Sequence, residues 1–350
     1  MTATLDTVRF SILDRSRVRR GQDHADALRE TVEFAALAQQ WGFHRFWVAE
    51  HHSVPGVAGT APTVLAAAVA AATDRIRVGT GGVMLPNHQP LVVAEQFGVL
   101  GALFPGRIDL GVGRSVGFTD GVRRALSHGR DDAEDFDTNL AELLDYLDAG
   151  RAGVHAKSAE GLDLPTFLLA TGSGAQRAAR FGLPLVIAPI AGRAAMVAAI
   201  DRYRAEFQPS ARSPHPWVIV SATVMIADSV EQARRLLLPE AWSSAYSRTH
   251  GEFPPLVSSA EVESITMTHR QRGFFEQALG EQIHGTEQEV AAALERLTQQ
   301  TGADEILVHT STFDRTARLD SHRRLARLVG LEPVPSGSPS RPANHPVTAL

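Results

Sequence analysis

Residues 166–188, TFLLATGSGAQRAARFGLPLVIA, place two short apolar runs on either side of a helical segment. The runs at 166–170 and 184–188 predict buried strands, and residues 175–181 predict a helix that ends at Gly182. A strand, a helix and a second strand in so short a stretch are typical of a parallel sheet with crossover helices. This stretch therefore indicates an α/β fold.

The same alternation of short β-branched runs and longer Ala- and Leu-rich segments continues along the chain. Eight runs have the length and composition of buried strands, which favours a closed (β/α)8 or TIM barrel over an open doubly wound sheet. We expect this barrel to form one domain over residues 1–330. The expected strands are residues 8–13, 45–49, 76–79, 108–112, 166–170, 184–188, 218–226 and 305–309.

One long segment, residues 229–284, falls outside the repeat, between the seventh and eighth expected strands. It is far longer than a crossover needs, and a long excursion after a barrel strand is commonly a lid or a specificity element. We interpret it as a lid, with a surface insertion of no role as the alternative. Residues 331–350 are rich in Pro and Ser, which predicts a mobile tail.

The composition narrows the classes of function. The formal net charge of the 350 residues is -5, which gives no basic surface for nucleic acid or an anionic membrane, so we expect a small-molecule partner. The chain contains no cysteine, which excludes disulfides, thiolate metal ligands and a cysteine nucleophile. The first residues do not resemble a signal peptide and no segment is apolar enough to span a membrane, so we expect a cytoplasmic protein.

Titratable residues follow the second expected strand, in WVAEHH at 47–52. Glu50, His51 and His52 lie just past a strand's carboxyl end, where the reactive groups of barrel enzymes are found. Successive strand side chains point to opposite faces, so the three cannot share one centre unless the chain turns, and we expect no metal site. Either a histidine is the acid or base of the site, or one histidine is buried and hydrogen-bonded and the other lies on the surface.

Glycines follow the third expected strand, in GTGGVMLP at 79–86. They permit an unusual backbone or the close approach of a ring, and a Gly-rich turn accounts for them equally well.

The fourth expected strand leads into Arg114, whose guanidinium could clamp a phosphate or could be solvated. Gly111, Gly113 and Gly117 are spaced one residue off the dinucleotide-binding fingerprint, and no acidic ribose partner follows at the expected distance. We therefore reject a Rossmann fold.

A group of small and hydroxylated residues separates the fifth expected strand from its helix: Thr171, Gly172, Ser173 and Gly174. Free backbone N–H groups at such a helix start form an anion site, although an ordinary N-cap explains the same residue types. Arg114, one strand away, favours the phosphate interpretation.

Taken together, these segments resemble the bacterial luciferase-like flavin monooxygenases. The order and the spacing both agree, and the resemblance continues through 171–184 and 302–310, so that it covers most of residues 8–310. It implies the TIM-barrel fold and a flavin cofactor. The segments that carry it are WVAEHH (47–52), IRVGTGGVMLP (76–86), AEQ (94–96), PGR (105–107) and GR (113–114).

The resemblance also implies roles for individual residues. His51 would be the catalytic histidine, with His52 and Glu50 beside it. Ala170 stands where luciferase has a carboxylate, and there is no cysteine near the site, so a biosynthetic or catabolic monooxygenase is favoured over light emission from a long-chain aldehyde.

For the cofactor, the resemblance implies a cis peptide bond between Gly81 and Gly82 beneath the flavin ring. We expect these two glycines and Thr80 before them to be cofactor-binding residues. The flavin phosphate would be contacted by Arg114 and Thr171, with Ser173 and the amides of Gly172 and Gly174 alongside.

The activity that the resemblance implies is a monooxygenase reaction. Reduced FMN from a separate NAD(P)H:flavin reductase would react with O2 to a flavin C4a-(hydro)peroxide, which inserts one oxygen into a small organic substrate. We expect a homodimer. Two alternatives remain open: an F420-dependent oxidoreductase that transfers hydride, and a non-catalytic flavin-binding protein.

Overall fold

The computed structural model describes residues 5–116, 119–127, 133–172 and 174–333. Its core is a closed barrel of eight parallel strands, in which each strand pairs with the next and the last pairs with the first. The predicted fold class is confirmed. In order around the barrel, the strands are Arg9–Asp14 (β1), Arg45–Val48 (β2), Arg77–Thr80 (β3), Ile108–Gly113 (β5), Thr166–Ala170 (β6), Leu185–Ile187 (β7), Val218–Ala222 (β8) and Glu305–Val308 (β11).

The prediction of one continuous strand over 218–226 is wrong. β8 ends at Ala222, and the chain continues as a separate strand, Val224–Ile226 (β9), which pairs outside the barrel with Ile283–Gly285 (β10). The Thr310 hydroxyl accepts a hydrogen bond from the Val224 N–H (2.8 Å) and donates one to the Val224 carbonyl (2.7 Å). Because this side chain takes both backbone groups of Val224, they are withdrawn from the barrel ladder.

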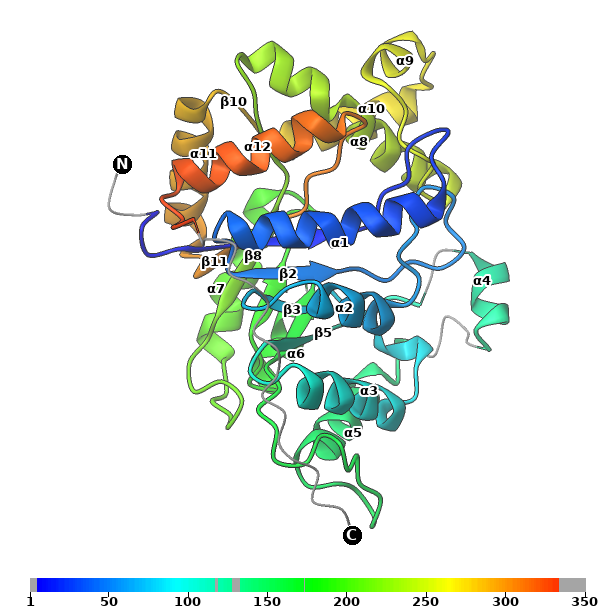
Figure 1. Ribbon diagram of the computed structural model, residues 1–350, viewed down its shortest axis with the longest axis vertical. Coiled ribbons are helices and arrows are strands. Elements are labelled where there is room, and N and C mark those ends of the chain that lie inside the picture. Colours follow the sequence, from blue (N-terminus) through cyan, green and yellow to red (C-terminus); the bar gives the residue numbers. More distant parts are fainter. Residues whose placement is uncertain (1–4, 117–118, 128–132, 173, 334–350) are drawn as a thin grey trace.

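Helices cover the outside of the barrel, and Figure 1 shows α1, α2, α3 and α5 following one another along the side that faces the viewer. The helix Glu287–Thr301 begins at a capping box of Thr286 and Glu289, and Gly302 ends it in the left-handed conformation (φ 56°). No helix in the described part of the chain combines the length and apolar character that crossing a membrane requires. The covering helices are His24–Gln40 (α1), Pro62–Ala71 (α2), Pro90–Leu103 (α3), Phe136–Asp148 (α5), Gly174–Arg180 (α6), Arg193–Glu206 (α7), Glu287–Thr301 (α11) and Arg315–Leu328 (α12).

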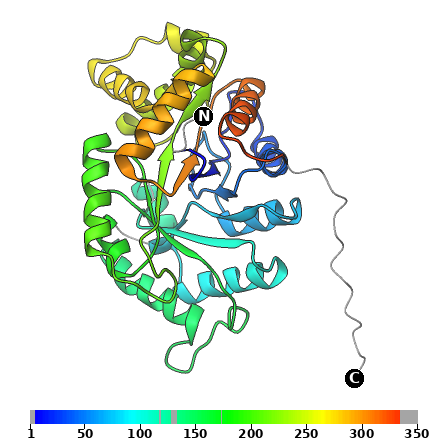
Figure 2. The same ribbon diagram turned by 90° about the vertical axis from the view of Figure 1, so that its left-hand side faces the viewer.

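The long segment after β9 is built from three helices, Val230–His250 (α8), Ser259–Ser264 (α9) and His269–Glu281 (α10). These helices have a small apolar cluster of their own, which includes Trp242 and Phe275. In Figure 2 they form the yellow group at one corner of the molecule. The expected tail, residues 331–350, lies outside the described residues from 334 onward.

A buried ion network fills the amino-terminal end of the barrel. Arg45 contacts Asp109 and Glu305, each at 2.8 Å, and Arg77 contacts Asp109 at 2.7 Å. Trp47 adds a hydrogen bond to Asp109 (3.1 Å). These residues come from the beginnings of their strands, so this end is closed by structural contacts, and the opposite end is left for a site.

Candidate active site

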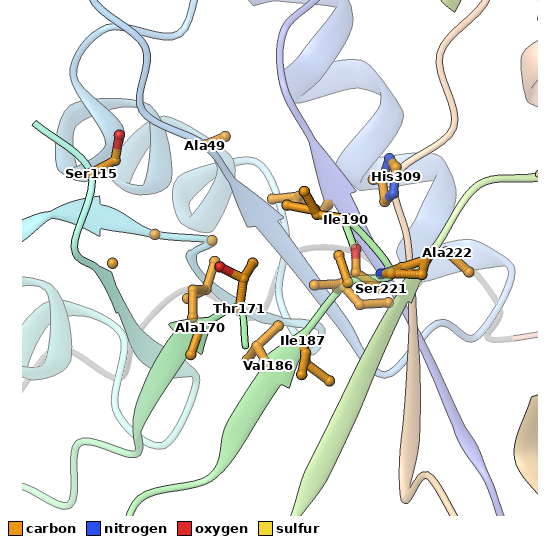
Figure 3. Close-up of a pocket in the computed structure, with 18 of the residues that line it drawn as sticks. Ala49, Ser115, Ala170, Thr171, Val186, Ile187, Ile190, Ser221, Ala222 and His309 are labelled. Atoms are coloured by element: carbon orange, nitrogen blue, oxygen red, sulfur yellow. The ribbon is translucent and has the colours of Figure 1, made fainter. Parts of the chain in front are cut away.

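A cavity of about 940 Å3 lies at the carboxyl ends of the barrel strands. Strand-end residues such as Ala49, Ala170 and Ala222 form much of its wall, and α8 and α10 of the long insertion contribute Glu240 and Gln277. Figure 3 shows Ser115, which follows β5, and His309, which follows β11, at opposite sides of this space. The cavity therefore has two separate ends, which differ in their chemistry.

Glu50 is the centre of a hydrogen-bonded triad on the cavity wall. Its Oε1 lies 2.6 Å from His52 Nε2 and 2.8 Å from His88 Nε2, and its Oε2 accepts a bond from the Met84 N–H at 2.8 Å. Burial opposes the charge of Glu50, but the bonds from His52 and His88 outweigh burial and lower the pKa to about 2. An ionised carboxylate only accepts hydrogen bonds, so both Nε2 atoms carry a proton.

The chain leaves the extended strand conformation after Glu50. Side chains close together in the sequence can therefore point to the same place here, which they cannot do along a straight strand. Ser53 adopts a positive φ of 52°, and Glu50 and His52 converge while His51 does not join them. Glu50, His52 and His88 each offer one atom within 4.8 Å of the others, a donor set that Zn²⁺ could take. The hydrogen bonds already account for this arrangement without an ion. His88 lies 38 residues from Glu50, and nothing in the local sequence pointed to it.

His51 occupies a different part of the cavity. Its backbone N–H donates to the Gly59 carbonyl (2.9 Å), and its ring meets the edge of Phe253, with 5.8 Å between the ring centroids. Burial, and then the charges of Arg15 and Arg17, lower the pKa of His51 to about 3. At neutral pH the imidazole is therefore uncharged.

The peptide bond between Gly81 and Gly82 is cis, as the resemblance implies, and both residues line the cavity. Gly82 approaches Gly111 so closely that a Cβ atom on it would lie 2.8 Å from the Gly111 carbonyl oxygen. Thr80 is fully buried, and its hydroxyl donates to the Gly111 carbonyl (2.8 Å). Thr80 thus supports this wall without lining the cavity.

Three of the five residues expected at a phosphate line the cavity. Arg114, Thr171 and Gly174 line it, together with Arg177, which is paired with Asp137 (2.7 Å). Arg114 is exposed, and its Nε donates to the Ala133 carbonyl (2.8 Å). Gly172 has a positive φ of 51° and does not line the cavity, and Ser173 lies outside the described residues.

The end of the cavity near His309 contains charged residues that the sequence analysis missed: Arg15, Arg17, Glu240 and His309 itself. Arg15 and Arg17 belong to the run RSRVRR at 15–20, just after β1, whose position after a strand end was the available signal. Glu240 lies on α8, far away in the sequence, and gave no signal.

Comparisons with known proteins agree with this architecture. Residues 8–305 match the family model described as luciferase-like monooxygenase. A curated relative from Escherichia coli (strain K12), named luciferase-like monooxygenase, is 37% identical over 321 residues, which cover 90% of this chain and 95% of that protein.

Two solved structures are similar as well. The crystal structure of apo-MsnO8 superposes with a TM-score of 0.82 at 31% identity and covers 94% of this chain and 100% of that one. The oxygenating constituent of 3,6-diketocamphane monooxygenase from Pseudomonas putida, solved in complex with FMN, has a TM-score of 0.71 at 16% identity and covers 92% and 98%. The second likeness concerns the fold alone.

Proposed function

Because the chain belongs to the luciferase-like monooxygenase family, we propose that it uses reduced FMN and O2 to add one oxygen atom to a small organic substrate. The observation that carries this proposal is the cavity of about 940 Å3 at the carboxyl ends of the strands, which is large enough for a ligand and whose lining includes Arg114 and Thr171, residues able to bind a phosphate.

The described residues fit a flavin. Gly81 and Gly82 present backbone without side chains, so a flat ring can approach this wall closely. Apolar side chains, including Leu13 and Val186, line the cavity as an aromatic ring system requires. Arg114 and Thr171 are placed to bind a phosphate, as a charge-assisted donor and a hydroxyl. Bound reduced flavin would supply the electrons and the site of reaction with O2.

The chain's own contribution would be binding, positioning and the exclusion of water. Glu50 fixes the Met84 N–H and so holds the segment that follows Gly81 and Gly82. With a pKa of about 3 the imidazole of His51 stays neutral at pH 7, and its role would be to share a hydrogen bond with a bound reactant. Residues of α8 and α10 on the wall support our interpretation of 229–284 as a cover for the cavity.

The expected partners remain part of the proposal. A separate NAD(P)H:flavin reductase would deliver reduced FMN, since the chain has no dinucleotide fingerprint. A homodimer is supported by apolar side chains on the outer faces of α2 and α3. These are Val64 (70% exposed), Val92 (45%), Val99 (50%) and Leu103 (65%).

Anaerobic titration followed by stopped-flow mixing with O2 tests the cofactor. We expect reduced FMN to bind, and its reoxidation to be slower with the protein than in free solution. Reoxidation at the free rate together with no binding of reduced FMN would overturn the proposal. Tight binding of reduced F420 with hydride transfer in the absence of O2 would replace it with the deazaflavin alternative.

The variant His51→Ala tests the role of the imidazole. In a product assay we expect turnover to fall by about 100-fold, with oxygen consumption diverted to hydrogen peroxide and FMN affinity unchanged. A variant with a lower melting temperature and unchanged coupling of oxygen to product would show that His51 is only structural.

A further inference from the structure

Two arginines follow β1 and line the end of the cavity near His309. Arg17 is 6% exposed, and the Arg15 side chain is 17% exposed. Both guanidinium groups are thus largely withdrawn from water at a wall where a ligand would lie. A buried cation is costly unless it is paired, so the partners of these two groups decide what the wall can bind.

The two arginines share one carboxylate among the described residues. Arg15 is ion-paired with Glu240, whose other oxygen accepts a bond from the Ser311 N–H (2.6 Å). The partners of Arg17 within the described residues are neutral: its Nε donates to the Gly56 carbonyl (3.0 Å), its Nη2 donates to Ser243 Oγ (2.6 Å) and to the Pro254 carbonyl (3.1 Å), and its guanidinium lies over the Phe253 ring.

Hydrogen-bonding capacity is left over at this wall. The buried Nε of Arg15 has no hydrogen-bond partner within the described residues. The hydrogen bonds of Arg17 described above are donated by its Nε and Nη2 and not by its Nη1. The Glu50 carboxylate is bonded to His52, His88 and the Met84 N–H, and it makes no ion pair with either arginine in the described part of the chain.

Two guanidinium groups thus lie beside one carboxylate, Glu240, that is directly paired with either of them within the described residues. Burial, and then the nearby charge of Arg15, lower the pKa of Arg17 to about 9, which is the expected response to an incompletely compensated pair of cations. His309 Nδ1 lies 3.8 Å from Glu240 Oε1.

We propose that Arg15 and Arg17 bind a carboxylate group of the substrate, so that the enzyme acts on an organic acid. This inference rests on the proposed function, in which this cavity holds the substrate. A guanidinium matches a carboxylate in shape and charge, and Arg15 already binds one in Glu240.

The flavin phosphate is not the anion in question. Arg15 Nη2 lies 3.4 Å from the His309 carbonyl oxygen, so this guanidinium belongs to the His309 end of the cavity. Ser115, next to Arg114, lies on the opposite side in Figure 3. A flavin whose phosphate contacts Arg114 would leave the arginine end for the substrate.

Pairs of probes that differ only in charge test the proposal: hexanoate against hexanamide, and 4-phenylbutyrate against 4-phenylbutyramide. Their binding to the FMN-loaded protein is measured by calorimetry. We expect the carboxylate of at least one pair to bind ten- to a hundredfold more tightly than its amide, the scale of charge-assisted hydrogen bonds. Equal binding of acid and amide in both pairs, or no detectable binding of any probe, would overturn the proposal.

Two variants move the preference in opposite directions. Arg15→Gln should reduce the preference for the carboxylate at least fivefold, and Glu240→Gln should increase it, because the competing internal carboxylate is removed. Arg20→Gln is the matched control, since Arg20 lies in the same run but is 65% exposed and pairs with Glu261. A change of the same sign in Arg15→Gln and Glu240→Gln would indicate a structural role only, and would contradict the proposal.

Further measurements keep the result interpretable. If Arg15→Gln does not fold, the double variant Arg15→Gln/Glu240→Gln removes the ion pair as a unit, and its preference should lie below that of Glu240→Gln. FMN binding is measured on the same samples, and the probes are also titrated into the flavin-free protein. A preference for the carboxylate without FMN binding would contradict the proposed function but support the anion site. FMN binding without a preference for the carboxylate would contradict this inference alone.

Discussion

Replacing Glu50 by Gln should destabilise the protein, because one acceptor oxygen of the side chain becomes a donor. The amide can still accept from His52 and His88, but its NH2 group then faces the Met84 N–H, which is left unpaired. A buried unpaired donor costs about 1–3 kcal/mol, and the bonds that survive lose their charge assistance.

The lowered pKa of Glu50 gives an independent magnitude for the stability that its charged form contributes. A fall from 4.5 to about 2 corresponds to about 3 kcal/mol in favour of the charged form in the folded state. The sign follows from linkage: the pKa is lowered on folding, so this stability is fully present above pH 4.5 and is lost as the pH falls through 2. At pH 7 the Glu50→Gln variant should therefore show the full loss of stability.

Calorimetry at pH 7 is the assay. With an unfolding entropy of roughly 2.1 cal/mol/K per residue, a loss of about 3 kcal/mol lowers the melting temperature by roughly 4 °C. We expect weaker FMN binding as well, since Met84 follows the two glycines of the cavity wall closely. Glu281→Gln, another carboxylate on the cavity wall, is the matched control and should change neither quantity.

An unchanged melting temperature in Glu50→Gln would refute this reasoning. A separate measurement tests whether a metal ion is bound by Glu50, His52 and His88. Dialysis of the unaltered protein against EDTA should leave its melting temperature as it is, and a fall would show that an ion, and not the hydrogen bonds alone, holds Glu50, His52 and His88 together.

Three other predictions follow from described contacts. Arg114→Ala should weaken FMN binding roughly tenfold or more and leave riboflavin binding unchanged in fluorescence titrations, and equal losses would reject a phosphate contact. Burial lowers the pKa of His322 to about 4, so stability should be complete above pH 6.5 and fall by roughly 2 kcal/mol by pH 5; urea unfolding of His322→Gln should lose this slope. Leu103→Glu should convert a dimer to a monomer in light scattering, and a variant of unchanged mass would place the interface elsewhere.

The barrel could be predicted from the sequence because each strand carries its own signal, a short buried run that ends in Gly or polar residues. The break between β8 and β9 could not be predicted. It depends on the Thr310 hydroxyl, 86 residues further along the chain, and residues 218–226 are suited to one strand as well as to two.

The site was predictable where it follows single strand ends, as for Glu50, His51 and Arg114. It was not predictable where it depends on which distant side chains meet. RSRVRR has the composition of a solvated run, and only the fold shows that Arg17 is buried and Arg15 half-buried at the cavity while Arg20 is on the surface. Glu240 on α8 supplies the carboxylate that pairs with Arg15 at this end, and no local pattern connects α8 with β1.

The small sheet of β9 and β10 has an evolutionary consequence. The two strands run parallel and side by side, with the Ile283 N–H bonded to the Thr223 carbonyl and the Ala227 N–H to the Gly285 carbonyl. The insertion therefore leaves and re-enters the barrel at adjacent points that are fixed to each other. A segment held at both ends in this way can vary without moving the eight barrel strands, as long as its contacts to Arg15, Arg17 and Ser311 are kept. Substitutions elsewhere on its cavity-facing side are then a route to new substrate preferences in this fold.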